Sequence, residues 1–109
     1  MLNESAVLDR VFQTLADPSR RSIVEQLNRG PAAVSVLAAP LDMSLPAVLQ
    51  HLHVLEESGL VRSEKVGRVR TCRLEPAALQ PAERWLRARR AAWERNLDRL
   101  GEYLATEDG

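Results

Sequence analysis

Apolar side chains recur at three- and four-residue steps along most of the chain, the spacing of one face of an α-helix. This pattern, with its flanking glycines, prolines and capping residues, predicts helices over 5–16, 18–29, 32–39 and 44–57 and a last helix over 82–105. A chain of 109 residues is near the usual size of one domain. We therefore expect all the helices to belong to a single unit.

The pattern changes after the fourth predicted helix. Residues 61–66 and 69–74 predict two strands joined through Gly67 as a hairpin. The order of elements predicts a mainly α fold with a small β-hairpin (α+β), namely a winged helix-turn-helix with an extended C-terminal dimerisation helix. In this fold the second helix of the turn, here 44–57, enters the DNA major groove. The expected single domain, 1–109, has a DNA-binding core over 5–75, a wing at 61–74 and a dimerisation helix over 82–105.

The fourth predicted helix lies within SLPAVLQHLHVLEESGLV at 44–61 and has one apolar stripe and one outward face. Val48, Leu52 and Leu55 follow one another at helical spacing and are expected to be buried. On the outward face Gln50 can bond adenine bidentately, and apolar side chains can contact a thymine methyl. The residues of this helix that we expect to contact DNA are Ser44, Leu45, Ala47, Gln50, His51 and His53.

Three of these residues have more than one interpretation. Ser44 is the expected N-cap, and its backbone N–H and hydroxyl are also placed for a phosphate. His51 either bonds a phosphate or makes a hydrogen bond inside the fold, whereas His53 is expected at a phosphate. Because the two histidines are two residues apart on a helix, their side chains diverge by about 200° and cannot share a metal ion.

Charge is concentrated in one segment, although the whole chain has 15 basic and 15 acidic residues and no net charge. Residues 61–74 hold five basic side chains against a single glutamate. Such a local excess suits contact with a polyanion. We expect Lys65, Arg68 and Arg70 to contact phosphates or the minor groove; the alternative is a charged hairpin edge that opposes aggregation.

Two further expectations concern the interior. One of Arg20 and Arg21 is expected to form an internal ion pair, for which Glu56 and Glu57 are candidate partners; the alternative is contact with DNA. Cys72 is the only cysteine, so no disulfide can form within the chain. Its alternation with the neighbouring residues predicts that it faces the core.

Three segments together resemble the ArsR family of bacterial repressors: LADPSRRSIVEQL at 15–27, SLPAVLQHLHVLEESGLV at 44–61 and VGRVRTCRL at 66–74. The resemblance covers about residues 5–75. It implies a homodimer that blocks transcription from an operator, often its own. The tail, with NLDRLGEYL, is similar to a metal-free autorepressor branch of the family.

The chain also differs from the family pattern. Metal-sensing members carry Cys-x-Cys on the third helix, where this chain has AVSVLAAPL, and the tail has no histidine for a C-terminal metal site. We therefore expect no metal and no cofactor. Leu49 stands where the family often has serine. Asp42 stands where the turn usually has glycine, and aspartate tolerates a left-handed conformation better than most residues.

The last predicted helix has a continuous apolar seam that its own domain is too small to cover. A second copy would bury this seam, together with part of the first helix. Two-fold symmetry then predicts an inverted-repeat operator with half-sites about 34 Å apart. The expected dimer interface consists of Leu8, Phe12, Leu86, Trp93, Leu97, Leu100 and Leu104.

The sequence also bears on other classes of protein. We expect no enzyme, because the sequence has no Ser-His-Asp set and no phosphate-binding glycine loop. We expect no membrane partner, because no apolar run approaches the roughly 20 residues that span a bilayer, and we expect a cytoplasmic location. Two alternatives stay open: a metal- or redox-responsive repressor with a non-standard sensor site, and a winged-helix protein-interaction module without DNA binding. The sequence identifies no small-molecule inducer.

Overall fold

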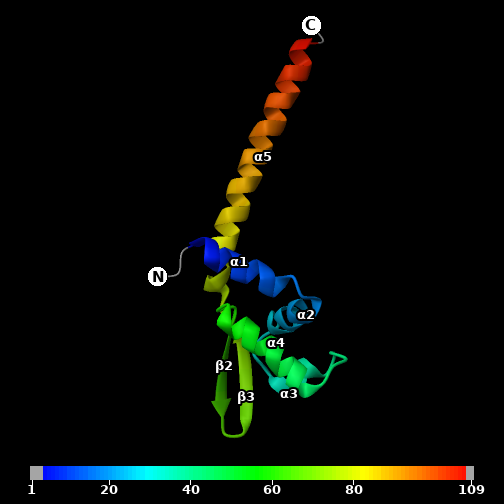
Figure 1. Cartoon of the computed structure of the whole chain (residues 1–109), viewed down its shortest axis with the longest axis vertical. Helices are drawn as coiled ribbons and strands as arrows, with labels where there is room; N and C mark the ends of the chain where they lie inside the picture. The colour runs from blue at the N-terminus through cyan, green and yellow to red at the C-terminus, as the bar shows by residue number, and fades with distance from the viewer. Residues whose placement is uncertain (1–3, 108–109) are drawn as a thin grey trace.

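The computed structural model describes residues 4–107 of the chain. Its helices and strands are shown in Figure 1. In chain order they are α1 (Glu4–Leu15), α2 (Pro18–Leu27), β1 (Ala32–Ala33), α3 (Val34–Ala38), α4 (Leu45–Glu57), β2 (Val61–Val66), β3 (Val69–Leu74), the 3-10 helix η1 (Pro76–Leu79) and α5 (Gln80–Glu107).

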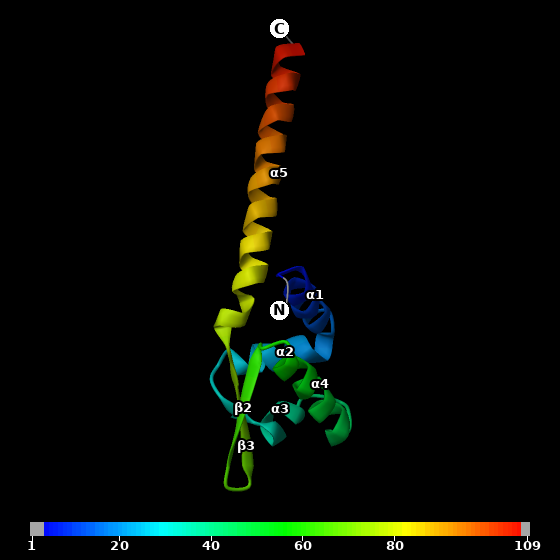
Figure 2. The same cartoon turned by 60° about the vertical axis from the view of Figure 1, so that its left-hand side comes forward.

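The molecule is a small body with one long helix extending from it. Helices α1 to α4 and the sheet form the body, and α5 extends away from it in both views (Figures 1 and 2), so that the molecule measures 73 × 35 × 21 Å. Helix α1 packs against the base of α5, where the rings of Phe12 and Trp85 meet edge to face with centroids 5.9 Å apart. Between residues 4 and 107 no helix has the length and apolar composition to cross a membrane.

Local signals set where the two central helices begin and end. The Asp17 carboxylate accepts hydrogen bonds from the backbone N–H groups of Ser19 and Arg20, at 2.8 and 3.1 Å, and so caps α2. The Ser44 hydroxyl accepts from the backbone N–H of Ala47 at 3.4 Å at the start of α4. After α4, Gly59 has a φ of 81°, a left-handed conformation that ends the helix and is favourable mainly for glycine.

The core lies where α2, α3 and α4 meet the sheet. The predicted stripe of Val48, Leu52 and Leu55 is fully buried, as are Ile23 and Leu37 on the facing helices. Cys72 lies in the same cluster, which confirms that it faces the core. Burial of this stripe fixes the rotation of α4 about its own axis and leaves its opposite side in solvent.

The sheet has three strands, which corrects the two-stranded prediction. β2 and β3 form the expected hairpin, and β1 adds to the other edge of β3, with Ala32 opposite Cys72 and Ala33 opposite Thr71. Residues 32 and 33 were predicted to begin the third helix. Alanine favours helix by local propensity, but pairing with the free edge of β3 satisfies the backbone and overrides that preference.

The remaining differences are small. The fourth helix and both hairpin strands have the predicted positions to within a residue, and α5 is two residues longer at each end than predicted. The connector before α5 contains the 3-10 helix η1, which was not predicted. Asp42 does not use a left-handed conformation, since among the described residues only glycines have positive φ.

Replacing Leu52 with alanine should lower the free energy of unfolding by about 2–5 kcal/mol, because a fully buried side chain is lost and a cavity remains. Val36 is a matched control, since it is 57% exposed, and Val36→Ala should cost less than about 0.5 kcal/mol. Urea titrations at equal protein concentration measure both values. Equal losses in the two variants would contradict the described core.

Candidate nucleic-acid interface

Helix α4 presents three different faces besides its buried stripe, because successive residues advance by about 100° around a helix. The outward face, opposite the core, consists of Pro46, Gln50, His53 and Glu57, all of them exposed. The face toward the wing holds Leu45, Leu49 and Glu56. The face toward α1 and α2 holds Ala47, His51 and Val54.

Gln50 lies near the middle of the outward face with its side chain in solvent. His53 is also exposed, and its Nε2 atom lies 3.0 Å from a carboxylate oxygen of Glu57, one turn further along α4. The structure thus puts the predicted Gln50 and His53 together on one surface. It also puts an acidic side chain beside His53, a neighbour that the sequence prediction did not consider.

His51 is half-buried and has a partner inside the fold. Its Nδ1 atom lies 3.4 Å from Nη1 of Arg20. A guanidinium has only donors, so the imidazole accepts at Nδ1 and carries its proton at Nε2. Of the two interpretations of His51, the structure therefore supports the internal hydrogen bond.

The predicted ion pair of Arg20 or Arg21 with Glu56 or Glu57 is wrong. Instead, Arg20 donates to the carbonyl oxygens of Thr14 and Gln13, at 2.8 and 3.2 Å. Arg21 donates to those of Leu15 and Ala16, at 2.8 and 3.0 Å. The last carbonyls of a helix lack partners within the helix and carry partial negative charge, so both arginines bind the end of α1.

The five basic residues of the wing fall into groups by their place on the hairpin. Lys65 and Arg70 are paired across the hairpin and lie on the same side as the buried Cys72, the side that faces α4. Arg62 and Arg73 are paired on the other side, and Arg62 forms a 3.1 Å ion pair with Glu75. Arg68 follows Gly67 at the exposed tip of the hairpin.

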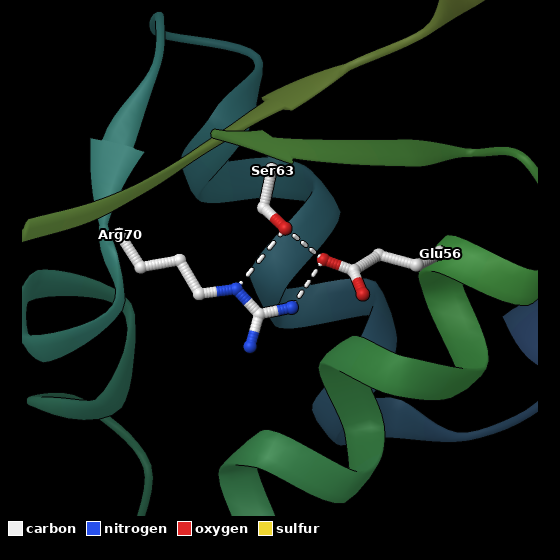
Figure 3. A network of polar contacts seen from close by, with 3 residues as sticks. All are labelled: Glu56, Ser63 and Arg70. Atoms are coloured by element: carbon white, nitrogen blue, oxygen red, sulfur yellow. Dashed lines mark hydrogen bonds and ion pairs between the residues drawn. The ribbon is translucent and has the colours of Figure 1, made fainter. Parts of the chain in front are cut away.

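Arg70 connects the wing to α4 through Glu56 and Ser63 (Figure 3). Its Nη2 atom lies 2.5 Å from Oε1 of Glu56, and its Nε donates to the Ser63 hydroxyl at 3.0 Å. The Ser63 hydroxyl in turn donates to the same carboxylate oxygen. Arg70 therefore has its charge balanced within the chain. By contrast, no ion pair involves Lys65, Arg68 or Arg73 within the described part of the chain.

The network also changes the acidity of Glu56. Partial burial opposes ionisation of its carboxyl, but the hydrogen bonds from Ser63 and Arg70 and the charge of Arg70 outweigh burial, so the pKa lies below its ordinary value of 4.5. The carboxylate is thus ionised at neutral pH. Charge-assisted hydrogen bonds to one oxygen hold α4 and both strands of the wing together.

Cys72 has no feature of a reactive thiol. It is fully buried, and burial raises the pKa of its thiol, although the charge of Arg70 acts in the opposite direction. Residues 4–107 also contain no group of three or more histidine, cysteine, aspartate or glutamate side chains that could hold a metal ion.

The apolar seam of α5 is uncovered in a single copy of the chain. Trp93 is 72% exposed and Leu97 is 66% exposed, and packing of α5 on its own domain therefore does not bury the seam. Phe12 is partly covered by Trp85, and Leu8 is half-buried on α1. The seam residues that are more than half exposed are Leu86, Trp93, Leu97, Leu100 and Leu104.

Sequence reasoning missed the roles of Glu56 and Ser63. The exposed basic wing was visible as a run of charge, but the partner of each charge depends on which elements meet in space. Alternation along the predicted strands could have placed Ser63 and Arg70 on the core side, facing the fourth helix. That signal would have pointed to Glu56 as their common partner.

A helix-turn-helix whose second helix is exposed beside a basic hairpin defines a winged helix-turn-helix protein. A family model described as "Helix-turn-helix domain" matches residues 15–64. The HTH-type transcriptional regulator Rv2034 of Mycobacterium tuberculosis is 49% identical over 71 residues, which span 65% of this chain and 66% of that protein.

Solved structures extend the similarity to almost the whole chain. A crystal structure described as an ArsR family transcriptional regulator is 47% identical with a TM-score of 0.80, and the match covers 86% of this chain and 97% of that one. The homodimeric winged helix-turn-helix domain of Mb0332 from Mycobacterium bovis is 27% identical with a TM-score of 0.62, covering 79% and 82%. The chain belongs to the ArsR family of transcriptional regulators.

Replacing Glu56 with glutamine should lower the free energy of unfolding at neutral pH by about 1 kcal/mol, because a charge-assisted network loses its anion. Since the folded pKa of Glu56 is lowered, its contribution is present above pH 4.5 and is lost as pH falls through the folded value. Urea titrations from about pH 7 to about pH 3 should therefore show wild type and variant converging in acid.

Glu64→Gln is the matched control for this measurement, since Glu64 is an exposed wing carboxylate without an ion pair among the described residues. The free energy of unfolding of Glu64→Gln should change with pH in parallel with that of wild type. A constant difference between wild type and Glu56→Gln across the pH range would show that the carboxylate charge is not what joins the helix to the wing.

Proposed function

We propose that the chain is a sequence-specific DNA-binding transcriptional repressor that binds an inverted-repeat operator as a homodimer in the cytoplasm. The observation that carries this proposal is the outward face of α4, which is exposed beside a wing with unpaired cations. Repression would follow from occlusion of a promoter by the bound dimer. Membership of the ArsR family supports the proposal.

The outward face of α4 has the chemistry for recognising base edges. Gln50 has a donor and an acceptor that match the N7 and N6 atoms of adenine in the major groove. Ser44 caps the helix at its N-terminus, where the helix dipole favours a phosphate. Its hydroxyl already accepts from the backbone N–H of Ala47, so Ala47 is left for apolar contact with a thymine methyl. His53 is exposed on the same face and can donate to a phosphate in place of Glu57.

The wing supplies contacts to the DNA backbone. Lys65 and Arg68 are exposed and form no ion pair in the described part of the chain. A DNA phosphate can therefore be the anionic partner of each. Arg70 is different, because binding a phosphate would compete with Glu56. We therefore assign Arg70 to positioning the wing and leave the direct phosphate contacts to Lys65 and Arg68.

The seam on α5 supports dimerisation. A helix of 28 residues is about 42 Å long, and most of its apolar side chains are uncovered in one copy. Exposed apolar surface on this scale is typical of an interface between proteins. We propose that two α5 helices pack against each other, with Leu8 and Phe12 of α1 at the margin of the interface.

The proposal is tested by binding of the purified protein to DNA upstream of its own gene, with a random duplex as control. Tight, selective binding that weakens steeply with salt is expected, because each phosphate contact releases counterions. Parallel titrations with zinc and with a chelator should give the same affinity. Equal affinity for both duplexes, followed by failure to select any preferred duplex from a random pool, would refute the proposal.

Gln50→Ala and Arg68→Ala should have different effects. The first should relax base preference at one position in each half-site by about 1–3 kcal/mol. The second should weaken binding to all sequences. It should also reduce the slope of log affinity against log salt concentration by about 1 for each subunit of the dimer. Arg29→Ala, which removes an exposed arginine from outside the interface, should leave both slope and preference unchanged. An unchanged ranking of operator variants with Gln50→Ala would refute the base contact.

Leu97→Glu should produce a folded monomer, because Leu97 is exposed in one copy and lies far from the core. Its affinity for a two-half-site operator should fall by about 100-fold or more, while affinity for a single half-site stays unchanged. Sedimentation and fluorescence anisotropy measure the two effects. Arg95→Glu places the same acid on the opposite side of α5 and should stay dimeric; a dimeric Leu97→Glu would rule out the α5 interface.

A further inference from the structure

Two leucines are exposed on the wing side of α4, where a solvated helix would carry polar residues. Leu45 is 54% exposed and Leu49 is 37% exposed. They are four residues apart, so their side chains lie one above the other on the same face. This face adjoins the outward face that carries Gln50.

The two leucines line a hollow between α4 and the wing, which we call the helix–wing hollow. Its wall on the α4 side is apolar, and arginines from β3 and the wing tip stand at its other side. The residues that line it are Ala33, Val34, Ser35, Leu45, Leu49, Arg68, Val69 and Arg70.

We propose that Leu49, together with Leu45, binds the 5-methyl group of a thymine in the major groove, and that Leu49 is a specificity-determining residue. The proposal rests on the function proposed above. It commits the helix–wing hollow to one occupant, the edge of a thymine whose strand continues to phosphates held by the wing. Each half-site of the operator then contains a thymine whose replacement by another base lowers the affinity of the protein.

The chemistry of the hollow favours thymine over the other bases. Thymine is the only one of the four bases with an apolar group in the major groove, and its methyl stands beside the O4 acceptor. Cytosine at that position carries no methyl group, so the leucine side chains would lose their apolar partner. Gln50, the next residue, suits adenine, so the two neighbouring side chains both favour A·T pairs.

The surrounding charges support DNA as the occupant. Arg68 at the tip of the wing has no ion pair in the described part of the chain and borders the same hollow as the leucines. The charged residues that line the hollow are Arg68 and Arg70; because Arg70 is paired with Glu56, Arg68 is the one left for a phosphate. The methyl group of a base edge matches the leucines, and the phosphates of the DNA backbone match Arg68.

The test uses the full-length protein and a duplex selected by it from a random pool. Each thymine is replaced singly by deoxyuridine, which removes the methyl and leaves every hydrogen-bonding group in place. At one or two thymines in each half-site, the replacement should weaken binding by wild type about fourfold, the scale of burying one methyl-sized group. Fluorescence anisotropy at fixed salt measures the change.

Substitution of the leucine should remove this sensitivity. Leu49→Ala should bind thymine and deoxyuridine duplexes equally at the sensitive position. Val36→Ala, which truncates an exposed side chain outside the hollow, should keep the wild-type profile. A cytosine placed there should bind wild type better when it carries a 5-methyl group, and Leu49→Ala should not distinguish the two.

The outcomes separate this inference from the proposed function. If no preferred duplex is selected, both are wrong. If a duplex is selected and no deoxyuridine position distinguishes wild type from Leu49→Ala, the proposed function stands and the thymine contact is wrong. That second result would leave the hollow as a surface for a partner other than DNA.

Discussion

The burial of one apolar stripe on α4 is the constraint on which the rest of the interface depends. Val48, Leu52 and Leu55 have no contact with solvent, so the helix cannot rotate about its axis without exposing them. This fixed rotation decides that Gln50 points outward and that Leu49 points toward the wing. Interior packing thus determines which side chains can meet a base, although none of the packed residues is near the surface.

The carboxylate of Glu56 extends this constraint from the helix to the wing. A hairpin held only at its base would sample many positions relative to α4, and binding would have to restrict them. The contacts of Glu56 with Ser63 and Arg70 impose that restriction beforehand (Figure 3). Preorganisation lowers the entropy lost on association, so an internal charged pair can affect affinity without itself contacting DNA.

The sequence predicted the features that depend on local pattern. The stripe on α4, the cap at Ser44 and the uncovered seam of α5 all follow from residues close together in the chain. Three features escaped prediction because each depends on how separate elements meet in space. Ala32 becomes a strand only by pairing with β3. Arg20 binds carbonyl oxygens, which every residue has and no sequence pattern marks. The partner of Glu56 lies fourteen residues away on another element.

The internal pairing of wing arginines also affects how the protein would search a genome. Arg62 and Arg70 are neutralised within the chain, so the positive surface left for phosphates is small, and the chain as a whole has no net charge. Non-specific affinity for DNA rises with the number of phosphates neutralised. A regulator built this way spends more of its time free in solution than a strongly basic one. Few copies of the protein are then bound to unrelated DNA. The fraction of operators that are occupied therefore depends directly on the number of copies of the protein in the cell.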